Sequence, residues 1–239
     1  MKLARGLTTV LLLGVAAAAM AGPEQVSASG SHVKMTRELA QINTSMKART
    51  NPSSGSKPIQ TLYSRRPITR ARTVLPVVAH ATDRHGAPWL RVLLPGRPNS
   101  RTGWIPGRLT TRSSTHWQVV VHTYTRRVIA YFNGRLMGSF KAVVGKPSTP
   151  TPLGRSFVEE TVKLSRSEAG APYALALSAR SNVLQEFAGG PGQIALHGTD
   201  NIGGALGTAV SHGCVRLDTR AISWLATRIG PGFPVNIIR

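Results

Sequence analysis

A single cysteine, Cys214, lies in the segment Ser-His-Gly-Cys-Val-Arg at positions 211–216, and the 239 residues contain no other. A lone cysteine cannot form a disulfide within its chain, so it is a buried inert thiol, an intermolecular bridge or a reactive thiolate. His212 lies two residues before it, Arg216 two after it, and His197 seventeen before it. An imidazole can take the thiol proton and an arginine favours the anion, so these neighbours indicate a thiol nucleophile.

Two glycines flank this constellation: Gly198 directly follows His197, and Gly213 directly precedes Cys214. Glycine lets the backbone approach a substrate, or adopt a turn that points an N–H group at a developing oxyanion. We therefore expect a catalytic loop around the cysteine.

Zinc binding is the main competing interpretation of these residues. His197, His212 and Cys214 are zinc-ligating types, and Asp200 or Asp218 would be a fourth ligand. His-x-Cys is not a usual zinc spacing, however, so the sequence favours nucleophilic chemistry with neither a metal nor an organic cofactor.

The pattern of His197 followed by Ser-His-Gly-Cys at 211–214 resembles the signature of the L,D-transpeptidase (YkuD-type) catalytic domain. A second segment, Val-Gly-Lys-Pro-Ser-Thr-Pro-Thr-Pro-Leu-Gly at 144–154, is similar to the Gly-Lys…Thr-Pro-Thr-Pro-x-Gly segment of the same family. Two motifs in the right order make the resemblance specific, and it covers roughly residues 117–239.

The resemblance implies a peptidoglycan L,D-transpeptidase. Cys214 would attack the carbonyl between residues three and four of a stem peptide and form a thioester. An amine of a neighbouring stem would resolve the thioester into a 3→3 cross-link, with His197 moving the protons. The backbone N–H groups of Gly213 and Cys214 would form the oxyanion hole, and the carbonyl of Gly198 would orient His197.

The resemblance gives the remaining residues of the loop supporting roles. Ser211 and His212 would shape the catalytic loop, and Arg216 would pair with a substrate carboxylate or brace the site. Tyr173 lies in a mixed stretch, residues 165–187, that we interpret as a cleft wall or lid, and we place it among the substrate-binding residues.

Two other functions stay open. The same acyl-enzyme resolved by water would make the protein an L,D-carboxypeptidase. A catalytically inactive domain would leave a basic protein that only binds the wall.

The charge is strongly positive, with 30 Lys and Arg against 9 Asp and Glu, or +21. Such a surface attracts polyanions, and anionic wall polymers are the partners that fit an exported protein. Nucleic acid fits poorly, because the chain has no nucleic-acid-binding motif and aromatic residues are only 5% of it.

The start of the chain reads as a signal peptide over residues 1–21. Lys2 and Arg5 precede a small-to-apolar run at 7–20, and Ala-Met-Ala at 19–21 suits a cleavage site. No later segment is long and apolar enough to cross a bilayer. We therefore expect an exported protein of the periplasm or cell wall, with no membrane span after cleavage.

Composition divides the remaining chain into three parts. Residues 22–57 are polar, with Asn-Pro-Ser-Ser-Gly-Ser at 51–56, and are predicted to be a flexible linker. Residues 58–115 carry short strand patterns that resemble a bacterial SH3-like module, at 73–81, 89–94 and 102–106.

Residues 116–239 form the predicted catalytic domain. Asn133-Gly134 predicts a hairpin between runs at 127–132 and 135–144, and further strands are expected at 117–123, 157–164, 193–197 and 235–238. One helix should begin after Asp218 and end before Gly230. The predicted fold is mainly β: a small SH3-like barrel, then a β-rich catalytic domain with one C-terminal helix.

Overall fold

A computed structural model describes residues 37–187 and 189–239, all within the unit Met35–Arg239. The predicted signal peptide and the first part of the predicted linker lie outside the described residues. No helix in the described part of the chain is long and apolar enough to cross a membrane.

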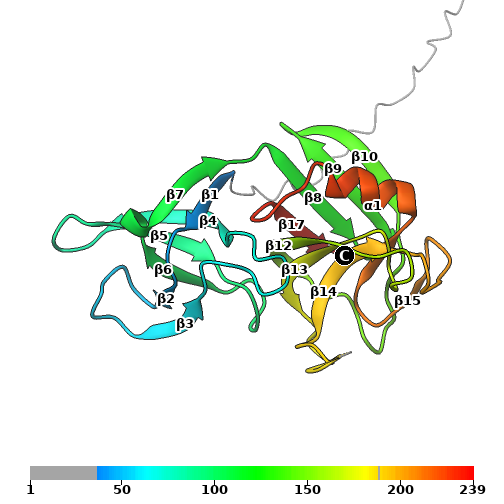
Figure 1. The fold of residues 1–239 in the computed structure, drawn as a ribbon, viewed down its shortest axis with the longest axis horizontal. Coiled ribbons are helices and arrows are strands. Elements are labelled where there is room, and N and C mark those ends of the chain that lie inside the picture. Colours follow the sequence, from blue (N-terminus) through cyan, green and yellow to red (C-terminus); the bar gives the residue numbers. More distant parts are fainter. Residues whose placement is uncertain (1–36, 188) are drawn as a thin grey trace, which may run out of the picture. The chain divides into compact units, whose positions relative to one another are not determined.

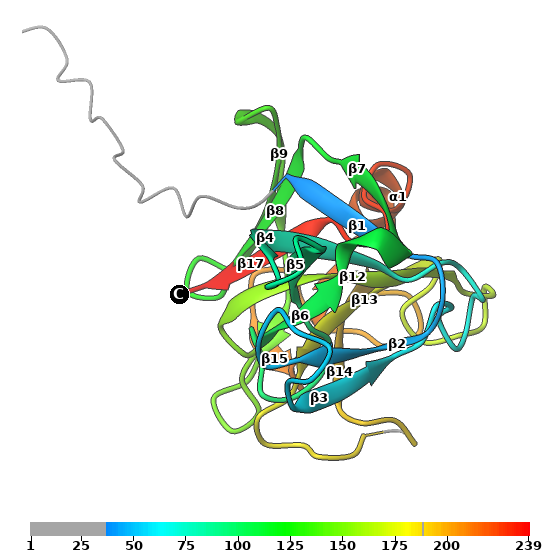
Figure 2. The ribbon, with the colours of Figure 1, turned by 90° about the vertical axis from the view of Figure 1, so that its left-hand side faces the viewer.

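The first part of the described chain forms a seven-stranded sheet with the order β3-β2-β6-β5-β4-β1-β7. Its strands are β1 (Glu38–Ile42), β2 (Met46–Arg49), β3 (Pro58–Leu62), β4 (Val74–Thr82), β5 (Pro88–Leu93), β6 (Thr102–Pro106) and β7 (Thr110–Ser114). A short 3₁₀ turn, Gly107–Leu109, separates the last two strands. Figure 2 shows this sheet, in blue to green, facing the viewer. The strand patterns at 73–81, 89–94 and 102–106 are confirmed, and an SH3-like identity stays a prediction.

The predicted linker is wrong from residue 38 onward. Strand β1 pairs with both β4 and β7, and strand β2 pairs with β3 and β6. Ala40, Ile42 and Ala48 are fully buried in the core of this sheet. The strands are four and five residues long, and their few apolar residues are spaced by polar ones, so composition alone resembles a linker.

The second sheet has eight strands in the order β10-β9-β8-β17-β12-β13-β14-β16. These are β8 (Trp117–His122), β9 (Arg127–Phe132), β10 (Arg135–Lys141), β12 (Gly154–Lys163), β13 (Tyr173–Arg180), β14 (Gln193–Gly198), β16 (Val215–Leu217) and β17 (Pro234–Ile238). A separate parallel pair joins β11 (Val144–Gly145) to β15 (Ala209–Ser211). The predicted mainly β fold is confirmed (Figure 1).

The hairpin predicted at Asn133-Gly134 is present between β9 and β10. Asn133 has φ 50° and Gly134 has φ 79°, which is the left-handed conformation that a two-residue hairpin turn needs at both positions.

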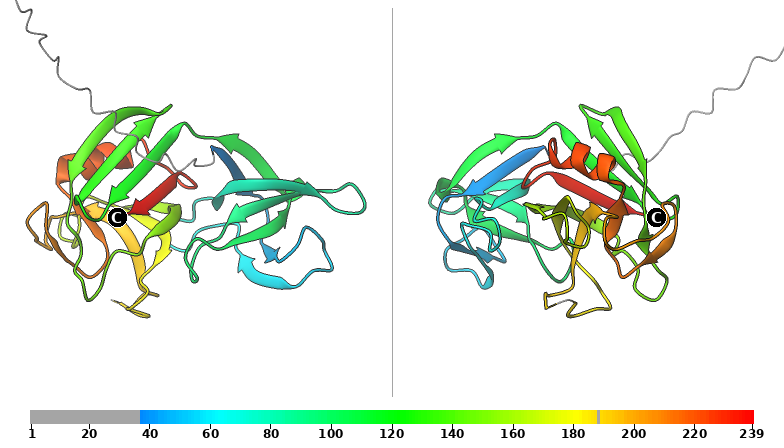
Figure 3. Two further views of the ribbon diagram at one scale, coloured as in Figure 1. Left: turned by 180° about the vertical axis from the view of Figure 1, so that it is seen from behind. Right: turned by 45° about the vertical axis from the view of Figure 1, so that its right-hand side comes forward.

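Strand β17 lies inside the second sheet although it follows every other strand in the chain. It runs parallel to β8 on one side and antiparallel to β12 on the other. Figure 3 shows the red strand between the green and yellow-green strands. It therefore joins the β8–β10 hairpin region to the strands that carry the cysteine.

Helix α1 (Thr219–Ala226) follows the cysteine segment, as predicted. Asp218 caps it, because its side chain accepts a hydrogen bond of 2.8 Å from the N–H of Ala221. The helix ends earlier than expected, with Thr227 rather than Gly230 at its C-terminus. Its buried residues, Ala221, Ile222 and Leu225, pack into the core of the second sheet.

The interpretation of residues 165–187 as a cleft wall or lid is wrong for its middle part. Strand β13 lies between β12 and β14, and its residues from Leu175 to Arg180 are all buried. A strand buried on both faces lacks the alternation that marks a half-exposed strand, so its small residues gave no clear signal. Of residues 165–187, those that line the cavity beside Cys214 are Ser181, Leu184 and Phe187, which all follow β13.

Candidate active site

A cavity of about 460 Å³ opens beside strands β14 and β16. It brings together four of the residues predicted from the sequence: His197, His212, Cys214 and Arg216. Its other lining residues are Ser181, Leu184, Phe187, Gly192, Gln193, Ile194, Ile202 and Val210.

Parallel pairing of β14 with β16 explains why these residues meet. Leu196 lies opposite Val215, and His197 lies opposite Arg216. Leu196 and Val215 are fully buried in the core, and because side chains alternate along a strand, the next residue on each strand points to the other face. That face is the cavity wall, and Cys214 precedes β16 with the same parity as Arg216.

His197 is held by its own neighbour. Its Nδ1 lies 2.8 Å from the carbonyl oxygen of Gly198, so we assign the proton to Nδ1 and leave Nε2 unprotonated and able to accept one. Burial lowers the pKa of His197, the Gly198 hydrogen bond opposes that shift, and the charge of Arg216 adds to it. The imidazole is therefore neutral near neutral pH, as a general base must be.

Gly198 cannot be replaced by a larger residue without movement. A Cβ atom there would collide with the carbonyl oxygen of Ala171, and the N–H of Gly198 already donates to the carbonyl of Gly170 at 2.8 Å. Close backbone packing thus fixes the carbonyl that holds His197.

Cys214 is partly exposed, and its thiol lies 3.8 Å from the carbonyl oxygen of Gln193. Burial raises the pKa of the Cys214 thiol, while the backbone N–H of Ala195 and the charge of Arg216 oppose that shift. The free protein therefore holds a protonated thiol, and a base must remove the proton during a reaction.

Ser211 and Gly213 shape the turn before the cysteine. The Ser211 hydroxyl donates to the carbonyl of Cys214 at 2.6 Å and accepts the N–H of Gly213 at 3.1 Å. Gly213 has φ +122°, a conformation that favours glycine. Its N–H is therefore already occupied, and the expectation that it serves as a free oxyanion donor is corrected.

The segment at 144–154 also forms hydrogen bonds to the turn before the cysteine. Thr149 donates to the carbonyl of Ser211 at 3.2 Å, and Thr151 donates to the carbonyl of Gly213 at 2.9 Å. The sequence predicted no individual role for the threonines of this segment. Both are buried, and they act as supports for the backbone of the cysteine turn.

His212 points away from the core and is exposed. Its ring stacks on Phe187, with centroids 5.4 Å apart and an angle of 27° between the planes. The cavity residues Phe187, Leu184, Ile202 and Val210 were not predicted as site residues. They lie on two loops and one short strand, so they form no sequence pattern.

Arg216 lies against the cavity with only 9% of its surface exposed. It donates one hydrogen bond of 3.1 Å to the carbonyl of Gly203. Its Nε is buried without a hydrogen-bond partner, and among the described residues it forms no ion pair. A buried charge with unused donors is suited to a carboxylate ligand.

Tyr173 is not brought to this cavity. It is the first residue of β13 and packs against the core of the second sheet. It does not line the cavity that contains Cys214, and its contact with substrate stays a prediction.

The alternative zinc ligands are not assembled either. Among residues 37–187 and 189–239, no three His, Cys, Asp or Glu side chains come together as a group that could hold a metal ion. Asp218 instead caps helix α1, and Asp200 accepts a hydrogen bond of 2.8 Å from Thr219.

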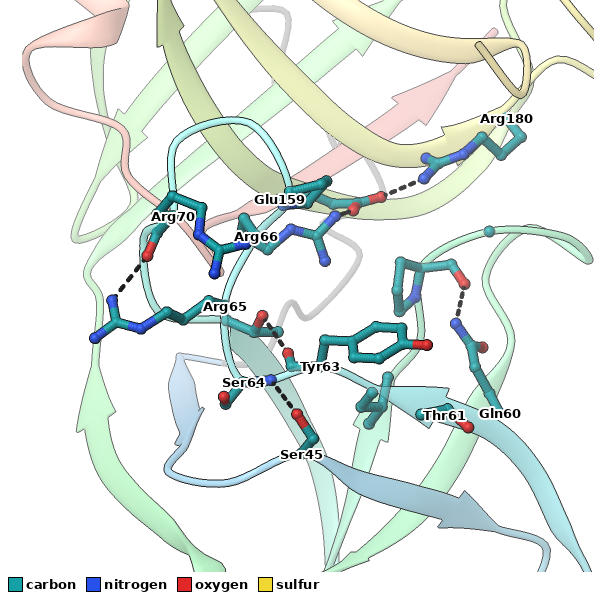
Figure 4. A pocket seen from close by; sticks show the side chains of 15 residues that line it. Ser45, Gln60, Thr61, Tyr63, Ser64, Arg65, Arg66, Arg70, Glu159 and Arg180 are labelled. Atoms are coloured by element: carbon teal, nitrogen blue, oxygen red, sulfur yellow. Dashed lines mark hydrogen bonds and ion pairs between the residues drawn. The ribbon is translucent and has the colours of Figure 1, made fainter.

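A larger cavity, of about 590 Å³, contains neither the cysteine nor His197. It lies between the first sheet and strands β12 and β13, where Arg66 and Arg180 point at the buried carboxylate of Glu159 from two sides (Figure 4). Burial lowers the pKa of Arg180 to about 10. The arrangement is a buried ion-pair network that includes none of the predicted site residues.

The class to which this fold and site belong follows from comparison with known families. A model described as the L,D-transpeptidase catalytic domain, YkuD, matches residues 116–237, just over half of the chain. The chain therefore belongs to the YkuD family of L,D-transpeptidases, which act on peptidoglycan peptides of the cell wall. The family resemblance seen in the sequence is confirmed.

Individual relatives cover more of the chain. YkuD of Bacillus subtilis (strain 168) is 27% identical over 148 residues, which span 62% of this chain and 74% of that protein. L,D-transpeptidase 3 of Mycobacterium tuberculosis, in complex with a faropenem-derived adduct, has a TM-score of 0.47 at 16% identity, covering 70% of this chain and 91% of that one. An L,D-transpeptidase of Mycobacterium smegmatis has a TM-score of 0.42 at 16% identity, covering 69% and 99%.

Proposed function

We propose that this protein is a cysteine-dependent peptidoglycan L,D-transpeptidase that forms 3→3 cross-links. The observation that carries the proposal is the convergence of Cys214 and His197 on one cavity, with Nδ1 of His197 held by the carbonyl of Gly198. That hydrogen bond leaves Nε2 as the nitrogen that accepts a proton.

Both reacting groups start neutral, which sets the proton path. The Cys214 sulfur attacks the carbonyl carbon of residue three of a stem tetrapeptide. As this bond forms, Nε2 of His197 takes the thiol proton. The C–N bond then breaks, and the imidazolium returns the proton to the leaving amine of residue four. An amine of a second stem attacks the thioester, gives its proton to His197, and releases the thiol.

Two further groups complete the proposed site. The backbone N–H of Cys214 is the proposed donor to the oxyanion, since the Gly213 N–H is already bonded to Ser211. Arg216 is proposed to bind a stem-peptide carboxylate through the donors that the protein leaves unused.

The cavity walls favour an amine over water as the acceptor. Leu184, Phe187, Ile202 and Val210 line it with apolar surface, and a peptide lying across them would exclude water from the thioester. Hydrolysis by the same acyl-enzyme would give an L,D-carboxypeptidase. Product analysis on disaccharide-tetrapeptide, with and without an added amine acceptor, separates the two reactions.

Replacement of the nucleophile is the direct test. Wild-type protein should convert disaccharide-tetrapeptide to cross-linked dimer, and Cys214→Ala should give none. Intact mass after incubation with imipenem should rise by one adduct in wild type and not in Cys214→Ala. Full exchange activity in the alanine variant would reject the proposal.

Export to the periplasm or cell wall, through the signal peptide at 1–21, is part of the proposal. Stem peptides are the proposed partners, and anionic wall polymers are further partners for a chain of charge +21. Sedimentation with purified sacculi at low and high salt tests the second point, because attraction between exposed charges weakens as salt rises. If the wild-type protein binds sacculi but shows neither peptide transfer nor hydrolysis, it is a wall-binding protein and not an enzyme.

A further inference from the structure

The loop between β5 and β6, residues 94–101, extends from the first sheet to the second. The N–H of Gly96 donates to the carbonyl of Ser178 on β13 at 2.9 Å, and the hydroxyl of Ser100 donates to the carbonyl of Arg155 on β12 at 3.0 Å. In Figure 1 the loop is the teal-green segment that points toward the second sheet from β5 and β6.

Arg97 at the tip of this loop binds three carbonyl groups of the β13–β14 loop, residues 181–187 and 189–192. Its Nε and Nη2 donate to the carbonyl of Ser181 at 2.9 and 2.7 Å. Nη2 also donates to the carbonyl of Leu184 at 2.8 Å, and Nη1 donates to that of Pro191 at 3.1 Å. One guanidinium thus links both ends of the loop.

Asn99 fixes the point where the β13–β14 loop leaves strand β13. Its Oδ1 accepts the N–H of Arg180 at 2.8 Å, and its Nδ2 donates to the carbonyl of Arg180 at 2.8 Å. Nδ2 also lies 3.0 Å from Oδ1 of Asn182. The side chain therefore satisfies both backbone groups of Arg180, as a neighbouring strand would.

The loop held in this way is a wall of the cavity that contains the cysteine. Ser181, Leu184 and Gly192 line that cavity, as does Phe187, which stacks on His212. The N–H of Ser181 donates to the carbonyl of Gly192 at 2.8 Å and closes the neck of the loop.

Gly192 leaves the space that Arg97 occupies. It has φ +64°, and a Cβ atom there would lie 2.9 Å from Nη2 of Arg97 and would also collide with the carbonyl of Leu184. The backbone of the loop is therefore shaped around the guanidinium.

Other contacts hold the two sheets together without touching this loop. Phe157 of β12 is buried in the core of the first sheet, and Arg66 pairs with Glu159. Association of the sheets therefore does not require Arg97 to bind the β13–β14 loop.

We infer that Arg97 and Asn99 are positioning residues, through which the first sheet sets the shape of the pocket for the donor peptide. The inference rests on the proposed function, and it makes the first sheet part of the acyl-transfer site in addition to any role in binding the wall. The residues act through the β13–β14 loop and do not touch the reacting atoms.

The test compares full-length Arg97→Ala, Arg97→Lys and Asn99→Ala with wild type. We expect KM for disaccharide-tetrapeptide to rise roughly tenfold in Arg97→Ala, with a smaller change in kcat, because the wall of the site is displaced while the cysteine is not. Arg97→Lys should recover only part of the loss, since the compact lysine ammonium cannot reproduce the hydrogen bonds that the planar guanidinium donates to three carbonyls. The matched control is Arg91→Ala, an exposed arginine of β5 whose side chain donates, among the described residues, only to Thr102; its KM should stay at the wild-type value.

A second readout does not depend on turnover. Amide hydrogen exchange in the β13–β14 loop should accelerate in Arg97→Ala and Asn99→Ala, and should be unchanged in helix α1 and in Arg91→Ala. Unchanged loop exchange together with an unchanged KM in folded Arg97→Ala would overturn the inference. Absence of transfer by wild type, with accelerated exchange in the variant, would reject the proposed function and leave the structural role of Arg97 standing.

Discussion

The hydroxyl of Thr151 donates a hydrogen bond of 2.9 Å to the carbonyl of Gly213, directly before the cysteine. The same hydroxyl accepts the N–H of Gly145 at 2.9 Å. One buried side chain therefore connects the two sequence motifs that mark the family, and the turn that presents Cys214 depends on a residue distant in sequence.

Thr151→Val should destabilise the protein by roughly 2 kcal/mol, because valine keeps the shape of the side chain but leaves the buried Gly213 carbonyl and the part-buried Gly145 N–H without this partner. Chemical denaturation followed by fluorescence measures this. The matched control is Thr161→Val, since the Thr161 hydroxyl is buried with no hydrogen-bond partner in the described residues, and its loss should be neutral or stabilising. Equal destabilisation by the two substitutions would contradict the role given to Thr151.

Ser211→Ala should slow thioester formation by roughly tenfold to a hundredfold, since a small displacement of a nucleophile is costly. The substitution removes the bonds to Cys214 and Gly213 that fix the turn. Ser211→Thr keeps the hydroxyl and should retain most of the rate. Stopped-flow acylation by imipenem is the measurement, and a fast Ser211→Ala variant would show that the turn holds its shape without the hydroxyl.

The charge of Arg216 lowers the pKa of both Cys214 and His197. A positive neighbour favours the thiolate and disfavours the imidazolium, so Arg216→Gln should raise both pKa values. The pH dependence of iodoacetamide alkylation should therefore move to higher pH, and the acid limb of kcat/KM should move in the same direction.

In the wild type, the thiol pKa lies above its usual range, so alkylation should still be increasing where a free cysteine has reached its plateau. The low pKa of His197 should extend activity further toward acid than an ordinary histidine allows. An alkylation profile that reaches its plateau near neutral pH would show that Cys214 and His197 instead rest as a thiolate–imidazolium pair.

Glu159→Gln should cost roughly 3–5 kcal/mol, because it leaves the buried guanidinium of Arg180 without its counter-charge and removes the ion-pair partner of the half-buried Arg66. Glu38→Gln is the control, since Glu38 is a half-exposed partner of Arg112 and His80 and such pairs contribute about 1 kcal/mol or less. Urea denaturation midpoints compare the two. Similar small losses would mean that water enters the larger cavity and screens the arginines.

Much of the fold could be predicted from short-range sequence patterns. The hairpin at Asn133-Gly134 needs only two residues that accept positive φ, and helix α1 needs only a capping aspartate and an apolar face. The convergence of His197 and Cys214 on one cavity also followed from the sequence, through the residue types around Cys214 and through the family resemblance.

Contacts between distant segments account for the errors. Strands β1 and β2 are too short and polar to be recognised until their partners β4, β6 and β7 are in place. The N–H of Gly213 was expected to bind the oxyanion, but it donates to Ser211 instead. That hydrogen bond depends on the conformation of the turn, which the sequence does not reveal. Arg97 was not singled out, since nothing near it in sequence indicates that its partners lie some 84 to 94 residues away.

The central place of β17 has a consequence for how the enzyme can be made. Without this strand, β8 and β12 would each present an unpaired edge, and no strand would connect the two halves of the sheet. A chain emerging from the ribosome or from a translocation channel cannot complete the sheet until the segment beyond helix α1 is free. Assembly of the cysteine site should accordingly be a late event in folding.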